Sequence, residues 1–169
     1  MKVFIMTGLP GSGKTTFAKK LCQEENAVHL SADILREKYY GDASIVGDGN
    51  LIFGKLKHFI NVNIREHKNI CIDNMSLRRN DRTKLLNFIK ICCNDYDIKD
   101  VEFNCYYMDT PVEVCIGRDS SRERVVGEEF INSRVDKLCI PSYDEAFDNI
   151  FFVKNADNNY VITKVEKLG

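Results

Sequence analysis

The chain has 169 residues, 44% of them hydrophobic and 29% charged, with a formal net charge of −1 at pH 7. With no low-complexity run, this predicts one globular domain over residues 1–169, with no overall positive field to attract nucleic acid except through a local patch. No segment approaches the ~18 apolar residues that cross a membrane, and seven cysteines without a C-x-x-C pair indicate reduced thiols rather than disulfides or zinc. We therefore expect a cytoplasmic protein with no membrane partner.

Residues 8–15, Gly-Leu-Pro-Gly-Ser-Gly-Lys-Thr, match the pattern G-x-x-x-x-G-K-[ST] at every fixed position. The apolar residues 2–7 before them predict a buried strand, and the spacing after them predicts a helix that ends near residue 26. A glycine-rich turn is the alternative, but these flanking elements favour a phosphate loop that binds ATP or another nucleoside triphosphate. The predicted donor-binding residues in the loop are Gly8, Gly11, Ser12, Gly13, Lys14, Thr15 and Thr16. In that motif the lysine reaches the β and γ phosphates, and the Thr15 hydroxyl is a ligand for Mg²⁺.

A second short strand is predicted over residues 27–30, followed by a helix over residues 33–40. Asp33 and Arg36 are three residues apart, so one helical turn places a carboxylate and a guanidinium on the same face. In an open α/β sheet, ligands bind at this carboxyl edge beside the phosphate loop. The alternative is that Asp33 only caps the helix.

Residues 41–49 are a glycine-containing connection that either borders an acceptor or is merely a loop. An amphipathic helix is predicted over residues 50–67, and a third strand over residues 69–73 ends in Asp73, the place of a Walker B carboxylate. Such a carboxylate can hold a Mg²⁺-bound water or orient an acceptor.

The next predicted helix, residues 77–94, begins with four basic residues, which we interpret as a phosphate contact or a solvated charged face: Arg78, Arg79, Arg82 and Lys84.

A fourth strand is predicted over residues 101–108, and Thr110-Pro-Val-Glu113 has the pattern of a capping box that starts a helix. That helix leads into three arginines within seven residues, Arg118, Arg122 and Arg124, a candidate phosphate clamp on a lid of approximately residues 118–127. Ion pairing with Asp119, Glu123, Glu128 and Glu129 is the competing explanation. A helix over residues 128–138, a strand over 150–153 and a C-terminal edge strand over 160–165 complete the predicted elements.

Alternating strands and helices around a phosphate loop predict an α/β fold of the P-loop NTPase or kinase type, with about five parallel strands and helices on both faces. Together with the loop, Ser31-Ala-Asp-Ile-Leu-Arg36 and residues 118–126 with Val114-Cys-Ile116 resemble the P-loop polynucleotide 5′-kinase family. Two weaker blocks, Ile72-Asp-Asn74 and Tyr143-Asp-Glu-Ala-Phe-Asp148, extend the resemblance over nearly the whole chain.

The resemblance implies transfer of the γ-phosphoryl group of ATP to the 5′-hydroxyl end of DNA or RNA. It implies Asp33, Lys14 and Arg122 as catalytic residues, with Asp33 as the general base, and Arg118, Arg122 and Arg124 as donor-binding residues of the lid. It implies Arg36, Asp73, Asn74 and Arg78 on the acceptor, and Thr15 and Asp73 at Mg²⁺. Two alternatives stay open, a P-loop kinase of a small hydroxyl compound and a nucleotide-binding regulatory switch.

Overall fold

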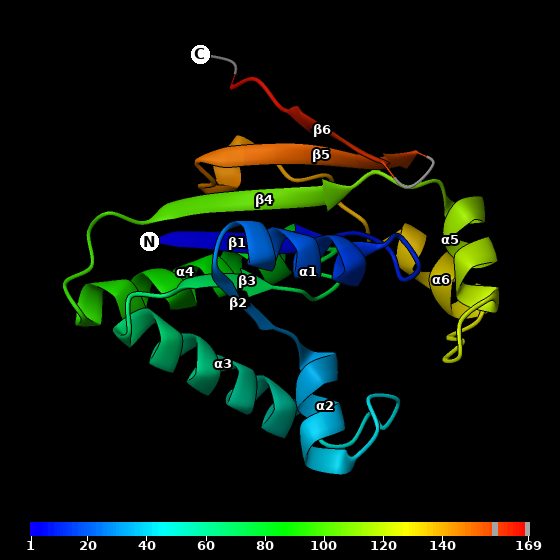
Figure 1. Ribbon diagram of the computed structural model, residues 1–169, viewed down its shortest axis with the longest axis horizontal. Coiled ribbons are helices and arrows are strands. Elements are labelled where there is room, and N and C mark those ends of the chain that lie inside the picture. Colours follow the sequence, from blue (N-terminus) through cyan, green and yellow to red (C-terminus); the bar gives the residue numbers. More distant parts are fainter. Residues whose placement is uncertain (157–158, 168–169) are drawn as a thin grey trace.

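The computed structural model describes residues 1–156 and 159–167, in which six strands form one sheet (Figure 1). Its order is β2-β3-β1-β4-β5-β6, and the strands are β1 (Lys2–Thr7), β2 (Ala27–Leu30), β3 (Asn69–Ile72), β4 (Glu102–Met108), β5 (Asn149–Ala156) and β6 (Asn159–Lys164). The first five in that order are parallel, and β6 pairs antiparallel with β5 at the edge. The predicted parallel sheet of about five strands is confirmed, with one antiparallel edge strand added to it.

The central strand β1 is buried on both faces, as a parallel strand covered by helices must be. Val3 and Ile5 pack into the cluster shared with α3 (Gly49–Arg65) and α4 (Arg79–Asp95). Phe4 and Met6 point to the other face, where they pack with side chains of α1 (Lys14–Glu24). Alternate side chains of β1 therefore pack against the helices on opposite faces of the sheet.

The remaining helices lie toward the end of the sheet to which β1 and β4 point (Figure 1). They are α2 (Ala32–Tyr40), α5 (Val112–Ser120) and α6 (Glu128–Val135), and a 3₁₀ turn covers Tyr143–Glu145. In Figure 1, α5 and α6 stand beside the loop between β1 and α1, and α2 projects below the sheet. No described helix is both long and apolar enough to cross a membrane, and all seven cysteines are free thiols.

The predicted Thr110 cap and the alternative in which Asp33 only caps its helix are both wrong. The hydroxyl of Thr110 does not cap α5 but donates to the Ser12 carbonyl at 3.1 Å, and Pro111 precedes the helix without a side-chain bond. Asp33 is not the cap of α2, because the Ser31 hydroxyl accepts the Ile34 N–H at 3.0 Å. The helix predicted over residues 128–138 ends at Val135 and continues as tight turns.

Candidate active site

The loop between β1 and α1 depends on glycine at defined positions. Gly8, Gly11 and Gly13 have φ values of +152°, +79° and +93°. A Cβ on Gly11 would lie 2.3 Å from the Cys115 carbonyl oxygen, so only glycine allows α5 to pack this closely. The Gly8 N–H donates to the Met75 carbonyl at 3.2 Å, which fixes the start of the loop against the segment after β3.

Lys14 lies within this loop with its ammonium group held by the backbone. Its Nζ donates to the Gly8 carbonyl at 2.9 Å and to the Leu9 carbonyl at 2.7 Å. Burial lowers the pKa of Lys14 to about 8, opposed by the nearby Asp73 carboxylate, which raises it. The loop thus contains a desolvated cation, and an anion bound beside it would gain a strong electrostatic partner.

Asp73 follows β3 at the carboxyl edge of the sheet and is almost fully buried. Its carboxylate lies 3.0 Å from Nε2 of His29, and its N–H donates to the Leu30 carbonyl at 2.8 Å. The next residue, Asn74, accepts the Ala32 N–H through its side-chain oxygen at 3.0 Å. The segment after β3 therefore contacts both β2 and the first residue of α2.

His29 is a residue of this site that no sequence motif indicates. Strands β2 and β3 pair with His29 opposite Cys71, so His29 and Asp73 point to the same face of the sheet. Their spacing of 44 residues carries no signal by itself. Only the knowledge that β2 and β3 are neighbours would have predicted this contact.

Asp33 lies on the exposed side of α2 between two arginines. Nη1 of Arg36 is 2.7 Å from one carboxylate oxygen, and Nη1 of Arg124 is 3.8 Å from the other. The Asp33 side chain is 62% exposed, so a substrate can reach it. The fold thus places Arg36, from the predicted acceptor side, and Arg124, from the predicted lid, beside the same carboxylate.

The loop of the lid follows α5, and its far end is held by Asp119, a buried acidic residue of that helix. The carboxylate of Asp119 accepts the N–H groups of Val126 and Gly127, the latter at 2.9 Å. In the part of the chain that the structure describes, no arginine of this cluster pairs with Asp119, Glu123, Glu128 or Glu129. The alternative that these acids explain the cluster is therefore wrong.

Arg118 and Arg122 face the phosphate loop. Nη1 of Arg118 lies 3.7 Å from the point where a Cβ of Gly13 would be, and Arg122 is close enough to Lys14 to lower its pKa. Within residues 1–156 and 159–167, four buried side-chain polar atoms have no hydrogen-bond partner. Three of them belong to predicted site residues, Ser12, Arg36 and Arg118. Because buried polar atoms are normally paired, the unpaired atoms of Ser12 and Arg118 indicate that a polar ligand binds at the phosphate loop.

The basic start of α4 has a different role from either one predicted. Arg82 is fully buried and forms two 2.7 Å bonds to the Glu145 carboxylate, while its Nη1 donates to the Ser76, Leu77 and Cys139 carbonyls. It is neither a phosphate contact nor part of a solvated face, so both interpretations are wrong for this residue. Arg79 pairs with Asp144 at 2.7 Å. Arg78 is exposed at the N-terminus of α4 and, among the described residues, forms no ion pair with another predicted site residue.

Thr15 and Thr16 are exposed in the first turn of α1. No group of three or more His, Cys, Asp or Glu side chains gathers as a metal site in the described ranges. Mg²⁺ prefers oxygen ligands and binds nucleotide complexes through one or two protein groups, with phosphates and water as the other ligands. A Thr15 hydroxyl and an Asp73 carboxylate fit that ligand set.

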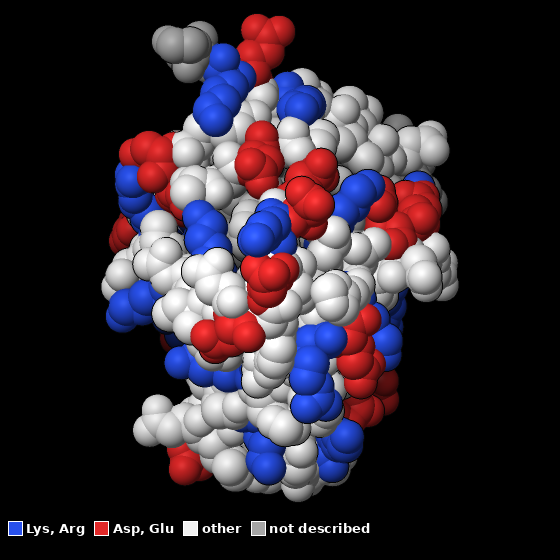
Figure 2. All heavy atoms as spheres, turned by 90° about the vertical axis from the view of Figure 1, so that its left-hand side faces the viewer, with Lys and Arg blue, Asp and Glu red and all other residues white. Residues whose placement is uncertain are grey.

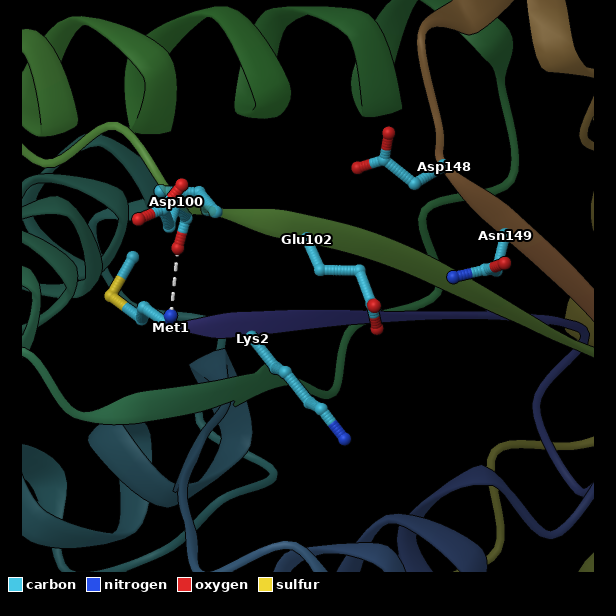
Figure 3. A pocket seen from close by; sticks show the side chains of 7 residues that line it. Met1, Lys2, Asp100, Glu102, Asp148 and Asn149 are labelled. Carbon is cyan, nitrogen blue, oxygen red and sulfur yellow. Dashed lines mark hydrogen bonds between the residues drawn. The ribbon is translucent and has the colours of Figure 1, made fainter.

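The opposite end of the sheet offers a contrasting surface. Acidic and basic side chains are interspersed there (Figure 2), and a hollow of about 600 Å³ is lined by Met1, Lys2, Asp100, Val101, Glu102, Asp148 and Asn149. The Met1 amino group donates to the Asp100 carbonyl at 2.8 Å (Figure 3), and Lys2 pairs with Glu25 at 2.8 Å. The Asp148 carboxylate accepts the Phe103 N–H. Among the described residues, no buried side-chain polar atom of this lining lacks a hydrogen-bond partner, in contrast to the phosphate loop.

Comparison with known proteins agrees with this geometry. The family described as AAA domain matches residues 3–138. L-seryl-tRNA(Sec) kinase of Methanococcus maripaludis is 24% identical over 180 residues, which cover 99% of this chain and 66% of that protein. The chain therefore spans slightly less than two thirds of that curated relative.

Solved structures share the fold at low sequence identity. A fungal RNA kinase has a TM-score of 0.63 and 15% identity, with 94% of this chain and 76% of that chain covered. A gluconokinase from Sinorhizobium meliloti 1021 has a TM-score of 0.57 and 12% identity, with 90% and 82% covered. The fold is that of P-loop kinases, whose members here differ in the acceptor that their names state.

Proposed function

We propose, because this chain belongs to the AAA domain family and has the fold of P-loop kinases, that it is an ATP-dependent phosphotransferase acting on the 5′-hydroxyl of a polynucleotide. The observation that carries the proposal is the position of Asp33, an exposed carboxylate between Arg36 and the lid residue Arg124. A phosphoryl transfer requires a group that orients or deprotonates the attacking hydroxyl, placed close to charges that stabilise the transferred group. A switch protein needs no such group.

Each residue then has a defined task. The loop from Gly8 to Thr16 binds the phosphates of ATP through its backbone N–H groups, and Lys14 turns from the loop carbonyls to the β and γ phosphates. Arg118 and Arg122 approach the same phosphates from the lid. Bound at Thr15 and Asp73, Mg²⁺ would supply charge neutralisation of the phosphates.

On the acceptor side, Asp33 accepts the proton of the attacking hydroxyl. Arg36 donates to Asp33 at 2.7 Å and orients this carboxylate, and its buried Nε has no hydrogen-bond partner among the described residues. Asn74, which accepts the Ala32 N–H, fixes the start of α2 against the segment that carries Asp73. Arg78 completes the proposed acceptor side from the start of α4.

The second candidate is a kinase of a small hydroxyl compound. The shared fold with a gluconokinase favours it, and the same catalytic residues would serve. The two candidates differ only in the acceptor. Incubation with γ-labelled ATP and a panel of 5′-hydroxyl oligonucleotides, nucleosides and sugars distinguishes them, because transfer confined to sugars would exclude the polynucleotide.

Asp33→Asn tests the role of the carboxylate in either case. Asparagine keeps the shape but not the basicity, so single-turnover transfer should fall by ~10²- to 10⁴-fold while ATP affinity is retained. The matched control is Asp97→Asn, since Asp97 is also an exposed aspartate in an ion pair, with Lys99 at 3.1 Å. Near-normal transfer by Asp33→Asn would remove the general base from the proposal.

A further inference from the structure

Helices α2 and α3 pack against each other below the sheet (Figure 1), and the seam between them includes Lys38 and Tyr39 in the last turn of α2. Aromatic and basic side chains meet across it. Nζ of Lys55 on α3 lies 5.3 Å from the ring centre of Tyr39 on α2, and Nζ of Lys38 lies 5.1 Å from the ring of Phe59. Tyr39 is 42% exposed, with Nζ of Lys38 also 6.0 Å from its ring centre, so part of this residue is open to a ligand beside two lysines.

A hollow of about 420 Å³ lies on the exposed side of α3, next to this seam. Its lining residues are Asn50, Leu51, Gly54, Lys55 and His58. Gly54 stands inside the helix, where glycine is unfavourable, and a Cβ there would meet no atom within 4 Å. Packing therefore does not require glycine at this position, and its absent side chain leaves the floor of the hollow open.

The formally charged side chains of α3 are all basic. Residues 49–65 contain Lys55, Lys57 and Arg65 but no aspartate or glutamate, in a protein whose net charge is −1. Asp48, just before the helix, accepts the N–H groups of Asn50 and Leu51, so its carboxylate is already bound to backbone donors. An anionic chain along α3 would meet lysines and no opposing carboxylate of that helix.

We infer that this seam binds single-stranded nucleic acid, with a base stacked at Tyr39 and the hollow at Gly54, and with Lys38 and Lys55 at the backbone phosphates. Exposed aromatic rings among lysines are the usual means of binding single strands. Tyr39 is six residues beyond Asp33, about 9 Å along the helix axis. A stacked strand covers that distance in about two to three nucleotides, counted from the reacting 5′ end. The inference rests on the proposed function and specifies which acceptor nucleotides determine affinity.

The test measures binding directly, without ATP. Fluorescence anisotropy is recorded with 5′-hydroxyl oligonucleotides of one to eight nucleotides, of DNA and of RNA, labelled at the 3′ end. Affinity for at least one of the two should rise with length up to about four nucleotides and then level off. Tyr39→Ala should weaken binding of the longer strands by roughly 5- to 150-fold, and Tyr39→Phe should bind like the wild type, because the ring provides the stacking.

Two further variants separate the hollow from general surface charge. Gly54→Leu fills the hollow with a residue that favours helix, so the protein folds and binding should weaken by tenfold or more. Lys55→Gln should weaken binding, whereas Lys20→Gln should not, although Lys20 lies over Tyr160 at 5.4 Å in a matching arrangement on α1. Equal effects of these two substitutions would overturn the inference.

The outcomes also separate this inference from the proposed function. If the protein phosphorylates 5′-hydroxyl oligonucleotides while Tyr39→Ala and Gly54→Leu bind them like the wild type, the seam is refuted and the polynucleotide kinase remains. If no oligonucleotide is bound or phosphorylated, the proposed function fails and the seam fails with it.

Discussion

Replacement of Lys14 by methionine should stabilise the protein without nucleotide and abolish its response to ATP. Burial lowers the pKa of Lys14 from 10.5 to about 8, which corresponds to a cost of about 3 kcal/mol for the ammonium group at pH 7. Methionine removes this cost but leaves the Gly8 and Leu9 carbonyls without their donor, at about 1 kcal/mol each. We therefore expect the free energy of unfolding to rise by about 1 kcal/mol at pH 7.

At high pH the difference in stability between the wild type and Lys14→Met should change sign. The folded pKa of about 8 lies below the unfolded value, so the unfolded chain binds more protons between pH 8 and 10.5. The stability of the wild type should consequently rise through that window, relative to Lys14→Met. At pH 10 the amine of the folded protein is almost entirely neutral, its hydrogen bonds persist, and the wild type should be the more stable protein by about 1 to 2 kcal/mol.

Urea unfolding of both proteins at pH 7 and pH 10 measures the two differences, and comparison of the pair cancels the titration of other tyrosines, cysteines and lysines. With Mg·ATP at 100 times its Kd, the wild type should gain about 2.7 kcal/mol and the variant nothing. The reasoning is refuted if Lys14→Met is the less stable protein at pH 7 by the same margin as at pH 10, or if ATP stabilises both equally.

Two other substitutions test the lid and the buried ion pair. Arg122→Ala should lower phosphoryl transfer by ~10³ or more in single-turnover assays, as loss of an arginine finger does, and Arg124→Ala should have a smaller effect; small and equal effects would identify the cluster as surface charge. Arg82→Met should lower the free energy of unfolding by about 3–5 kcal/mol, because it leaves the Glu145 carboxylate buried without its cation. Adding Glu145→Leu should recover most of that loss in the same urea unfolding experiment, and a double variant no more stable than the single one would contradict the argument.

The sequence predicted the local part of the site better than its long-range contacts. The phosphate loop and its flanking strand and helix are adjacent in the chain, so residue spacing alone predicted them. The parallel sheet followed from the alternation of strands and helices, but the strand order did not. The contact between His29 and Asp73 depends on that order, because it requires β2 beside β3.

Arg82 and Thr110 show why the other local predictions were wrong. Four basic residues near the start of a helix predict a solvent-exposed face, because charged side chains are rarely buried. Arg82 is buried nevertheless, because Glu145, 63 residues away, forms an ion pair with it. The Thr110 pattern satisfies the rule for a capping box, yet the Ser12 carbonyl, 98 residues away, takes its hydroxyl. In both cases a distant partner outcompetes the local one, and no pattern of neighbouring residues indicates it.

The position of β1 between β3 and β4 has a consequence for synthesis of the chain. Lys2 pairs in register with Glu102. About 100 further residues must therefore be synthesised after β1 before β4 can form hydrogen bonds with it. At 5–20 residues per second this interval lasts about 5 to 20 s. During that time the apolar residues Val3, Phe4, Ile5 and Met6 have an open strand edge, which favours aggregation of the nascent chain. From this strand order we expect slow folding, and a soluble yield that rises with chaperones or at low temperature.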